Sequence, residues 1–244
     1  MRIGIFSDVH ANLEALQAVA KYFLEEKIEK SLFIGDLVGY GANPNECVEI
    51  VQKLNSLPIA GNHDYGVIGK SDISTFNHAA QSAITWTQKI LTNKSIKFIK
   101  SLLIRNAYRN NLLIHSSPEK PDDWRYVLTL KEAENQFNYF REKICFIGHS
   151  HLPCVVEKND ANNEVKIINH EKFGIRGDNY QYLINVGSVG QPRDGNSRAC
   201  VFIFDTKMKI VEMKRLEYNY KLTQGKILNA GLPSVLAYRL AEGK

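Results

Sequence analysis

Five short apolar segments of this chain end in polar residues of the same kind, and this repetition constrains the fold more than any other feature. The residues that follow them are aspartate, asparagine and histidine, which can all bind a metal ion. In α/β sheets, ligands bind beyond the carboxyl ends of the strands. Five such endings in one fold are therefore expected to converge on one site. They are Asp8-Val9-His10, Gly35-Asp36, Gly61-Asn62-His63-Asp64, His115 and Gly148-His149-Ser150-His151.

The last of these endings carries two histidines two positions apart. In an extended chain, residues i and i+2 point to the same side, so His149 and His151 are expected to project together. Two adjacent imidazoles suggest a metal site, whereas a single histidine is more often a packed structural residue. Five of the seven histidines follow these apolar segments, which favours the metal interpretation for the whole set.

The number of candidate ligands indicates more than one metal ion. A single tetrahedral zinc needs about four ligands, so a larger set with a bridging carboxylate would serve two ions. Mixed imidazole and oxygen ligands suit Mn, Fe, Zn, Ni or Co and do not favour Ca. Only two of the ligands are anionic, so two divalent ions would leave a positive pocket suited to a phosphate. The seven candidates are Asp8, His10, Asp36, Asn62, His115, His149 and His151.

The order of the apolar segments predicts an α/β fold. The first part of the chain alternates strand and helix, and the part after the paired histidines is mostly strand. This pattern predicts two sheets packed face to face as a β-sandwich flanked by helices, in a single domain over residues 1–244. Strands are expected at 2–7, 31–34, 57–60, 111–114, 144–147, 155–156, 165–168, 182–186, 199–204 and 210–215. Helices are expected at 12–26, 44–54, 74–103 with a break near 93–94, 130–140 and after 222.

Composition narrows the class of protein. The chain has 244 residues, 44% of them hydrophobic, which suits one large core. No apolar run approaches the roughly 18 residues of a membrane span, and the N-terminal segment resembles a strand and not a signal peptide, so we expect a cytoplasmic protein. The net charge of +5 suits an anionic substrate, but the scattered Lys and Arg residues do not predict a nucleic-acid partner.

The four cysteines are far apart and are expected to be buried free thiols. No pattern indicates the oligomeric state.

The series D-x-H, G-D, G-N-H-D, H and G-H-x-H, in this order, resembles the calcineurin-like metallophosphoesterase family. The resemblance covers nearly the whole chain and implies a four-layer αββα fold. The compact length and the segment 187–193 are similar to the small bacterial and archaeal phosphodiesterase-type branch.

The resemblance also implies a role for each residue of these motifs. The first metal would be held by Asp8, His10 and His151, the second by Asn62, His115 and His149, and Asp36 would bridge them. It further implies hydrolysis of phosphodiesters or phosphomonoesters of small molecules or nucleotides, by attack of a metal-bridging hydroxide. His63 would act as general acid at the substrate and not as a ligand, with Asp64 fixing its tautomer. Mn is the expected metal, with Fe, Zn, Ni or Co as alternatives.

Other residues have two interpretations each. Arg193 follows a glycine-rich turn and either contacts a substrate phosphate or lies on the surface. Asn12 is either a helix N-cap or a substrate contact. His78 either lines the pocket or is an ordinary helix residue, and Tyr40 is expected near the site. His170 is expected to be exposed.

Two rival functions remain to be weighed. A binding scaffold with a vestigial site would lack some ligands or His63, and none is missing here. A binuclear hydrolase of amide or lactam bonds would show a cluster such as H-x-H-x-D-H, which is absent. The expected substrate loops, 38–45, 64–78, 116–127 and 170–181, carry no recognisable code for the physiological substrate.

Overall fold

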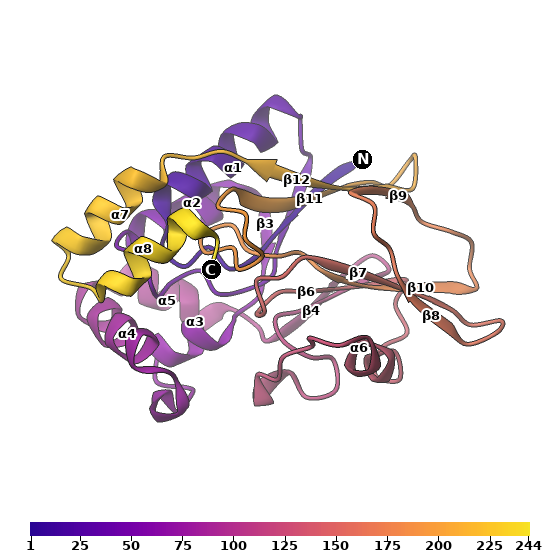
Figure 1. The fold of residues 1–244 in the computed structure, drawn as a ribbon, viewed down its shortest axis with the longest axis horizontal. Helices are drawn as coiled ribbons and strands as arrows, with labels where there is room; N and C mark the ends of the chain where they lie inside the picture. The colour runs from indigo at the N-terminus through magenta and orange to yellow at the C-terminus, as the bar shows by residue number, and fades with distance from the viewer.

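The computed structural model describes residues 1–244 and contains two six-stranded sheets. Helices cover the sheets on the outside (Figure 1), which confirms the predicted α/β sandwich. The first sheet has the order β3-β2-β1-β11-β12-β9, and the second has the order β4-β5-β6-β10-β7-β8.

The first sheet is built around three parallel strands. β2 pairs with β1 and with β3 in parallel, while β11 and β12 add antiparallel partners on the other side. The carboxyl ends of β1, β2 and β3 therefore lie at one edge. The strands are β1 (Arg2–Phe6), β2 (Lys30–Phe33), β3 (Ser56–Pro58), β9 (Lys172–Gly174), β11 (Ala199–Asp205) and β12 (Ile210–Leu216).

The second sheet has a parallel centre of its own. β6 pairs in parallel with β5 and with β10, and β4, β7 and β8 extend the sheet with antiparallel pairs. The strands are β4 (Arg105–Tyr108), β5 (Asn111–Ile114), β6 (Ile144–Ile147), β7 (Cys154–Asn159), β8 (Glu164–Ile167) and β10 (Tyr180–Asn185).

A buried apolar cluster joins the two sheets. Ile3 and Ile5 of the first sheet pack in it with Phe146 and Ile184 of the second. Because successive side chains of a strand alternate between faces, Phe6 lies on the opposite face, in a cluster with residues of the covering helices. The two sheets are thereby held in fixed relative positions, as a shared site requires.

Helices cover both outer faces (Figure 1). α1 and α2 pack on the first sheet through one apolar cluster, and α6 packs on the second through another. The helices are α1 (Leu13–Glu25), α2 (Pro44–Lys53), α3 (Asn62–Val67), α4 (His78–Ile90), α5 (Asn93–Ser101), α6 (Leu130–Gln136), α7 (Tyr220–Asn229) and α8 (Ser234–Glu242), with short 3-10 helices at Ile73–Thr75 and Pro121–Asp123. None of them is both long enough and apolar enough to span a bilayer.

Some elements differ from the expectation. The long helical region divides at Leu91 and Thr92, where the Thr92 side chain accepts a hydrogen bond from the Ser95 N–H and caps α5. The predicted tail is two packed helices, α7 and α8. The short strands β4 and β9 were not predicted, because their partly exposed, polar-rich sequences lack the buried apolar run of the central strands.

Candidate metal centre

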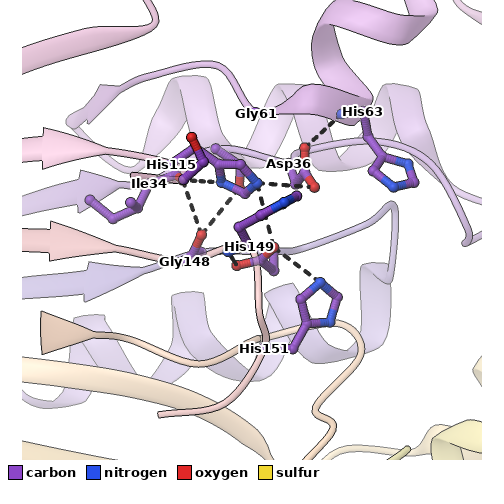
Figure 2. A network of polar contacts seen from close by, with 12 residues as sticks. Ile34, Asp36, Gly61, His63, His115, Gly148, His149 and His151 are labelled. Carbon is purple, nitrogen blue, oxygen red and sulfur yellow. Dashed lines mark hydrogen bonds and ion pairs between the residues drawn. The ribbon is translucent and has the colours of Figure 1, made fainter. Parts of the chain in front are cut away.

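The five predicted strand endings meet at one place in the structure. They follow β1, β2 and β3 of the first sheet and β5 and β6 of the second. Figure 2 shows Asp36, His115, His149 and His151 gathered at this place. All seven candidate ligands are buried: Asp8, His10, Asp36, Asn62, His115, His149 and His151. The sandwich thus places ligands from two sheets in one enclosed cluster.

The backbone at this cluster is strained. Asp8, His10, Asp36, His149 and His151 have φ values of 53°, 49°, 57°, 66° and 62°, in the left-handed region. Such conformations cost of order 1–3 kcal/mol each in a residue other than glycine, and they concentrate at functional sites. Backbone hydrogen bonds between the loops hold them, including 2.9 Å from the Asp8 N–H to the Gly35 carbonyl. The fold therefore maintains these side-chain directions against a local cost.

Two glycines let the loops approach the carboxylates closely. A Cβ atom on Gly61 would lie 2.1 Å from Oδ1 of Asp36, and one on Gly148 would lie 2.5 Å from Oδ2 of Asp8. Both distances are far below van der Waals contact, so no other residue fits without displacing a candidate ligand.

One group of donors contains Asp8, His10 and His151. Nε2 of His151 lies 3.1 Å from both Oδ1 of Asp8 and Nε2 of His10. The other ring nitrogens contact backbone carbonyls: Nδ1 of His10 lies 3.3 Å from the Val38 oxygen, and Nδ1 of His151 lies 2.5 Å from the Gln191 oxygen. With Nδ1 donating, both Nε2 atoms carry lone pairs toward Asp8, as metal-binding histidines do.

A second group contains Asp36, His115 and His149, whose ligand atoms lie within 4.8 Å of one another. Nδ1 of His115 donates to the Ile34 carbonyl at 2.7 Å, which directs Nε2 toward Asp36. In His149 the two ring nitrogens exchange these roles. Its Nε2 lies 2.8 Å from the Trp124 carbonyl, which leaves Nδ1 for the site. Oδ1 of Asn62, the first residue of α3, is buried without a hydrogen-bond partner.

Asp36 lies between the two groups. Its Oδ2 is 3.6 Å from Nε2 of His10 and 3.3 Å from Nε2 of His115, and its Oδ1 accepts a hydrogen bond of 2.8 Å from the His63 N–H. Figure 2 shows it facing both His115 and α3. This position is the one that a bridging carboxylate needs.

Charge and burial set the protonation of the cluster. Burial by itself raises the pKa of Asp8, but His151 and His115 hold it well below its usual range. The pKa of His115 is raised to about 9, because Asp36 and Asp8 outweigh its burial. Burial lowers the pKa of His149 to about 4 and that of His151 to about 3, with help from the charges of His115 and Arg193 respectively. His149 and His151 are therefore neutral at pH 7, as metal ligands must be.

His63 lies at the side of this cluster, on α3. Its ring centroid is 4.7 Å from that of His10, 4.4 Å from that of Tyr40 and 5.4 Å from that of Phe76. Nδ1 is buried without a hydrogen-bond partner. A ring nitrogen of His63 also lies within 4.8 Å of donor atoms of His10 and Asp36, so distance alone does not separate a ligand from a substrate contact.

Asp64 does not hold the ring of His63, and this part of the prediction is wrong. Its carboxylate accepts three backbone hydrogen bonds, from Gly61 at 3.0 Å, Leu37 at 2.9 Å and Val38 at 3.2 Å. It thereby joins the loop after β2 to the start of α3. Burial and the charge of Asp36 raise the pKa of Asp64 to about 7.

Asn12 is the N-cap of α1 and has no free hydrogen-bonding atom for a substrate. Its Oδ1 accepts from the Ala15 N–H at 3.2 Å and from the Thr223 hydroxyl at 3.1 Å. Its amide donates to the Gly190 carbonyl at 2.8 Å and to the Tyr218 hydroxyl at 3.2 Å. Of its two predicted roles, the structure therefore favours the cap over the substrate contact.

The remaining candidates divide between the site and the surface. Arg193 lies beside the cluster: its guanidinium donates to the Gln191 side chain at 3.1 Å, and its charge lowers the pKa of His63 and His151. Tyr40 contacts the rings of His10 and His63. His78 is an exposed residue at the start of α4, and His170 is exposed as expected.

Sequence reasoning missed two aromatic residues of the loop 116–127. Trp124 supplies the carbonyl that orients His149, and Tyr126 stacks on the His149 ring at 4.1 Å and 13°. The loop was expected to matter for substrate, but no motif marks these two positions. The backbone of Trp124 is in the left-handed region, with φ of 53°.

The donor set fits divalent transition metals. It combines imidazole nitrogens with carboxylate oxygens, which suits Mn, Fe, Zn or Ni. Oδ1 of Asp8 and Oδ1 of Asn62 are buried without hydrogen-bond partners, which is costly unless another group binds there.

Comparison with known proteins agrees with this geometry. The model of the calcineurin-like phosphoesterase superfamily domain matches residues 1–209. A protein of Methanocaldococcus jannaschii, MJ0912, described as uncharacterized, is 42% identical over 99% of this chain and 98% of its own. The crystal structure of a metallophosphoesterase from Sphaerobacter thermophilus is 37% identical, with a TM-score of 0.86 over 100% of this chain and 99% of that one.

A more distant structure shares the fold. The hypothetical protein PH1004 from Pyrococcus horikoshii is 18% identical and superposes with a TM-score of 0.82 over 100% of this chain and 98% of its own. The matched residues, 1–209, include the positions of all seven candidate ligands. This chain therefore belongs to the calcineurin-like phosphoesterase superfamily.

Proposed function

We propose that this protein is a phosphoesterase that depends on two divalent metal ions, with Mn as the working metal. The observation that carries the proposal is the position of Asp36 between two groups of buried donors. Asp8, His10 and His151 would hold one ion, and Asn62, His115 and His149 the other. Two divalent ions bound there would polarise a phosphate and lower the pKa of water.

The residues around the donors would position the substrate. Arg193 lies beside the cluster and can bind a phosphate oxygen, since no carboxylate pairs with it. The ring of His63 lies beside that of His10 and would donate a proton to the leaving oxygen. Burial lowers the pKa of His63 well below its usual value, and a phosphate anion beside the ring opposes that effect. The protonated ring is then favoured when substrate is bound. The substrate would be a small phosphorylated molecule, either a monoester or a diester.

Turnover after metal replacement tests this proposal. The protein would be stripped with a chelator, reloaded with Mn²⁺ and assayed with p-nitrophenyl phosphate and bis-p-nitrophenyl phosphate. We expect release that depends on the metal, and the faster of the two compounds would distinguish a phosphatase from a phosphodiesterase.

Two variants make the test specific. His63→Ala should keep the metals and lose turnover by about 100-fold or more, the usual contribution of a general acid. His78→Ala, which changes an exposed histidine outside the cluster, is the matched control and should remain active. If His63→Ala lost a metal instead, His63 would be a ligand. Wild-type protein inactive with Mn²⁺, Ni²⁺, Co²⁺ and Fe²⁺ would favour the non-catalytic scaffold.

A further inference from the structure

The C-terminal helix α8 brings a second arginine, Arg239, to the side of the site where Arg193 and His63 lie. We propose that Arg193 and Arg239 form an anion subsite that binds a phosphate on the leaving group of the substrate. The inference rests on the proposed function and makes it narrower: the preferred substrates would be phosphoanhydrides or bisphosphates.

Arg193 has no acidic partner. The nearest carboxylate in sequence, Asp194, is paired with Arg215. Nη2 of Arg193 donates to the Gln191 side chain at 3.1 Å, while Nε is buried without any hydrogen-bond partner. A buried, unpaired guanidinium N–H is costly, and an anion that accepts a hydrogen bond from it would remove that cost.

The position of Arg193 is tied to the metal site. Gln191, two residues earlier, supplies the carbonyl that orients His151, and the Arg193 N–H lies 3.5 Å from the His151 carbonyl. The guanidinium also acts electrostatically on His63, which is proposed as the general acid. A group bound by Arg193 would therefore lie near the leaving oxygen.

The packing of α8 places Arg239 nearby. Leu236 and Leu240 of α8 pack in one apolar cluster with Tyr40, whose ring contacts His63. Arg239 follows buried Leu236 by three positions and exposed Val235 by four, so it lies at the edge of the helix face that packs on this cluster. Tyr40, Leu236 and Leu240 also line one cavity with His10 and Gln191.

The end of α8 is attached to the loop that carries Arg193. The Gly195 N–H donates to the Gly243 carbonyl at 2.9 Å, and a Cβ atom on Gly243 would lie 2.5 Å from the Asn196 nitrogen. Figure 1 shows the C terminus beside the strand ends. The Arg239 Nε donates to the backbone oxygen of Lys244, and no carboxylate side chain pairs with it.

The positive charge of Arg193 also acts on Arg239. Burial, with the charge of Arg193 next, lowers the pKa of Arg239, and both arginines act on the Tyr40 hydroxyl. An anion that binds both guanidinium groups would stabilise them, since no carboxylate side chain pairs with either one. Because α8 packs on Tyr40, whose ring contacts His63, we assign the anion to the leaving group. Arg239 also lies beyond residues 1–209, so the subsite depends on the C-terminal helices and not on the family domain alone.

Binding of phosphonates, which are not hydrolysed, tests the subsite without turnover. Calorimetry on the Mn²⁺-loaded protein would compare methylenediphosphonate with methylphosphonate, with free Mn²⁺ in the same excess throughout so that chelation is equal. We expect wild-type protein to bind the diphosphonate about tenfold more tightly or better, the effect of one charge-assisted hydrogen bond.

The variants assign that preference to the two arginines. Arg239→Gln keeps a long polar side chain and removes the charge, and it should abolish most of the diphosphonate preference. Arg193→Gln should do the same, while Arg141→Gln, which changes an exposed arginine between α6 and β6, should retain it. Melting temperatures would show that all three variants are folded.

Equal affinity of wild-type protein for the two phosphonates, or an unchanged preference in Arg239→Gln, would overturn the subsite. These results differ from failure of the proposed function. A protein that never turns over p-nitrophenyl esters but keeps an Arg239-dependent preference for the diphosphonate would retain the subsite and lose the catalytic proposal.

Discussion

At the scale of single residues, the metal-free site holds one more proton than a metal-loaded site could. Asp36 and Asp8 raise the pKa of His115 to about 9, so its imidazole is protonated at pH 7. Asp8 and Asp36 remain ionised, because the surrounding histidines hold their pKa values well below the usual range. The positive charge of protonated His115 therefore balances part of the negative charge of Asp8 and Asp36 when no metal is bound.

Metal binding should therefore release a proton from His115. A ligand must give up its proton to bind, so metal affinity should rise with pH up to about 9 and fall below it by about tenfold per unit for one proton. Calorimetry of Mn²⁺ binding at pH 7.5 in buffers of different ionisation enthalpy measures the protons released. His170→Ala, at an exposed position, should give the same number, and release of no proton would contradict the assignment.

The types of residue in the site could be predicted from the sequence, but their hydrogen bonds could not. D-x-H, G-N-H-D and G-H-x-H place donors after apolar segments, and the structure brings all seven together. The partner of Asp64 was predicted wrongly, because its carboxylate lies against the backbone of Leu37 and Val38, which are distant in sequence. Arg239 was missed since nothing local marks an arginine of a C-terminal helix as part of a site.

At the scale of elements, the site depends on the close contact between the loop after β2 and the start of α3. Gly61 is the N-cap of α3 with φ of −106°, which any residue can adopt, so glycine is required by space and not by conformation. The strands themselves were predictable because their buried apolar runs are continuous. The division between α4 and α5 was predicted within two residues.

Gly61→Ala should damage the site more than the fold. The added Cβ meets Asp36 at 2.1 Å, and overpacking of this kind costs about 1–3 kcal/mol. We expect a lower melting temperature and loss of Mn²⁺ binding, measured by thermal unfolding and by calorimetry. Gly177→Ala, where the Cβ would meet nothing within 4 Å, is the matched control. Normal Mn²⁺ binding by Gly61→Ala would show that Asp36 does not need its present position.

Gly225 in α7, unlike Gly61, should be replaceable by alanine with a gain in stability. Nothing lies within 4 Å of an added Cβ, and glycine inside a helix is less favourable than alanine by about 1 kcal/mol. Gly225→Ala should therefore stabilise the protein by up to about that amount in urea unfolding. A destabilised variant would indicate that α7 packs differently.

At the scale of the whole molecule, the two sheets together position the residues of one candidate site. Asp8, Asp36 and Asn62 follow the ends of β1, β2 and β3, while His115 and His149 follow β5 and β6. The sandwich could be predicted from the change between alternating elements and consecutive strands. The contact of α8 with the site could not, because it depends on how the C-terminal helices pack back on Tyr40.

The closed core should also protect the cysteines. Burial raises the pKa of Cys47 and Cys145 well above the usual value and that of Cys200 to about 12, so these thiols carry almost no thiolate at pH 8. Cys154 is only partly buried. Ellman's reagent should react slowly with one thiol of the native protein and with four after denaturation. Rapid reaction of several native thiols would contradict the packing.

Metal stoichiometry tests the central claim most directly. Protein stripped with a chelator would be equilibrated with Mn²⁺, and the bound metal per chain would be counted by elemental analysis. The bridging position of Asp36 predicts two ions in wild-type protein and loss of both in Asp36→Asn. Asp160→Asn, an exposed aspartate on the β7–β8 turn, should still bind two. One ion or none in wild-type protein, or two full sites in Asp36→Asn, would contradict a binuclear centre bridged by this residue.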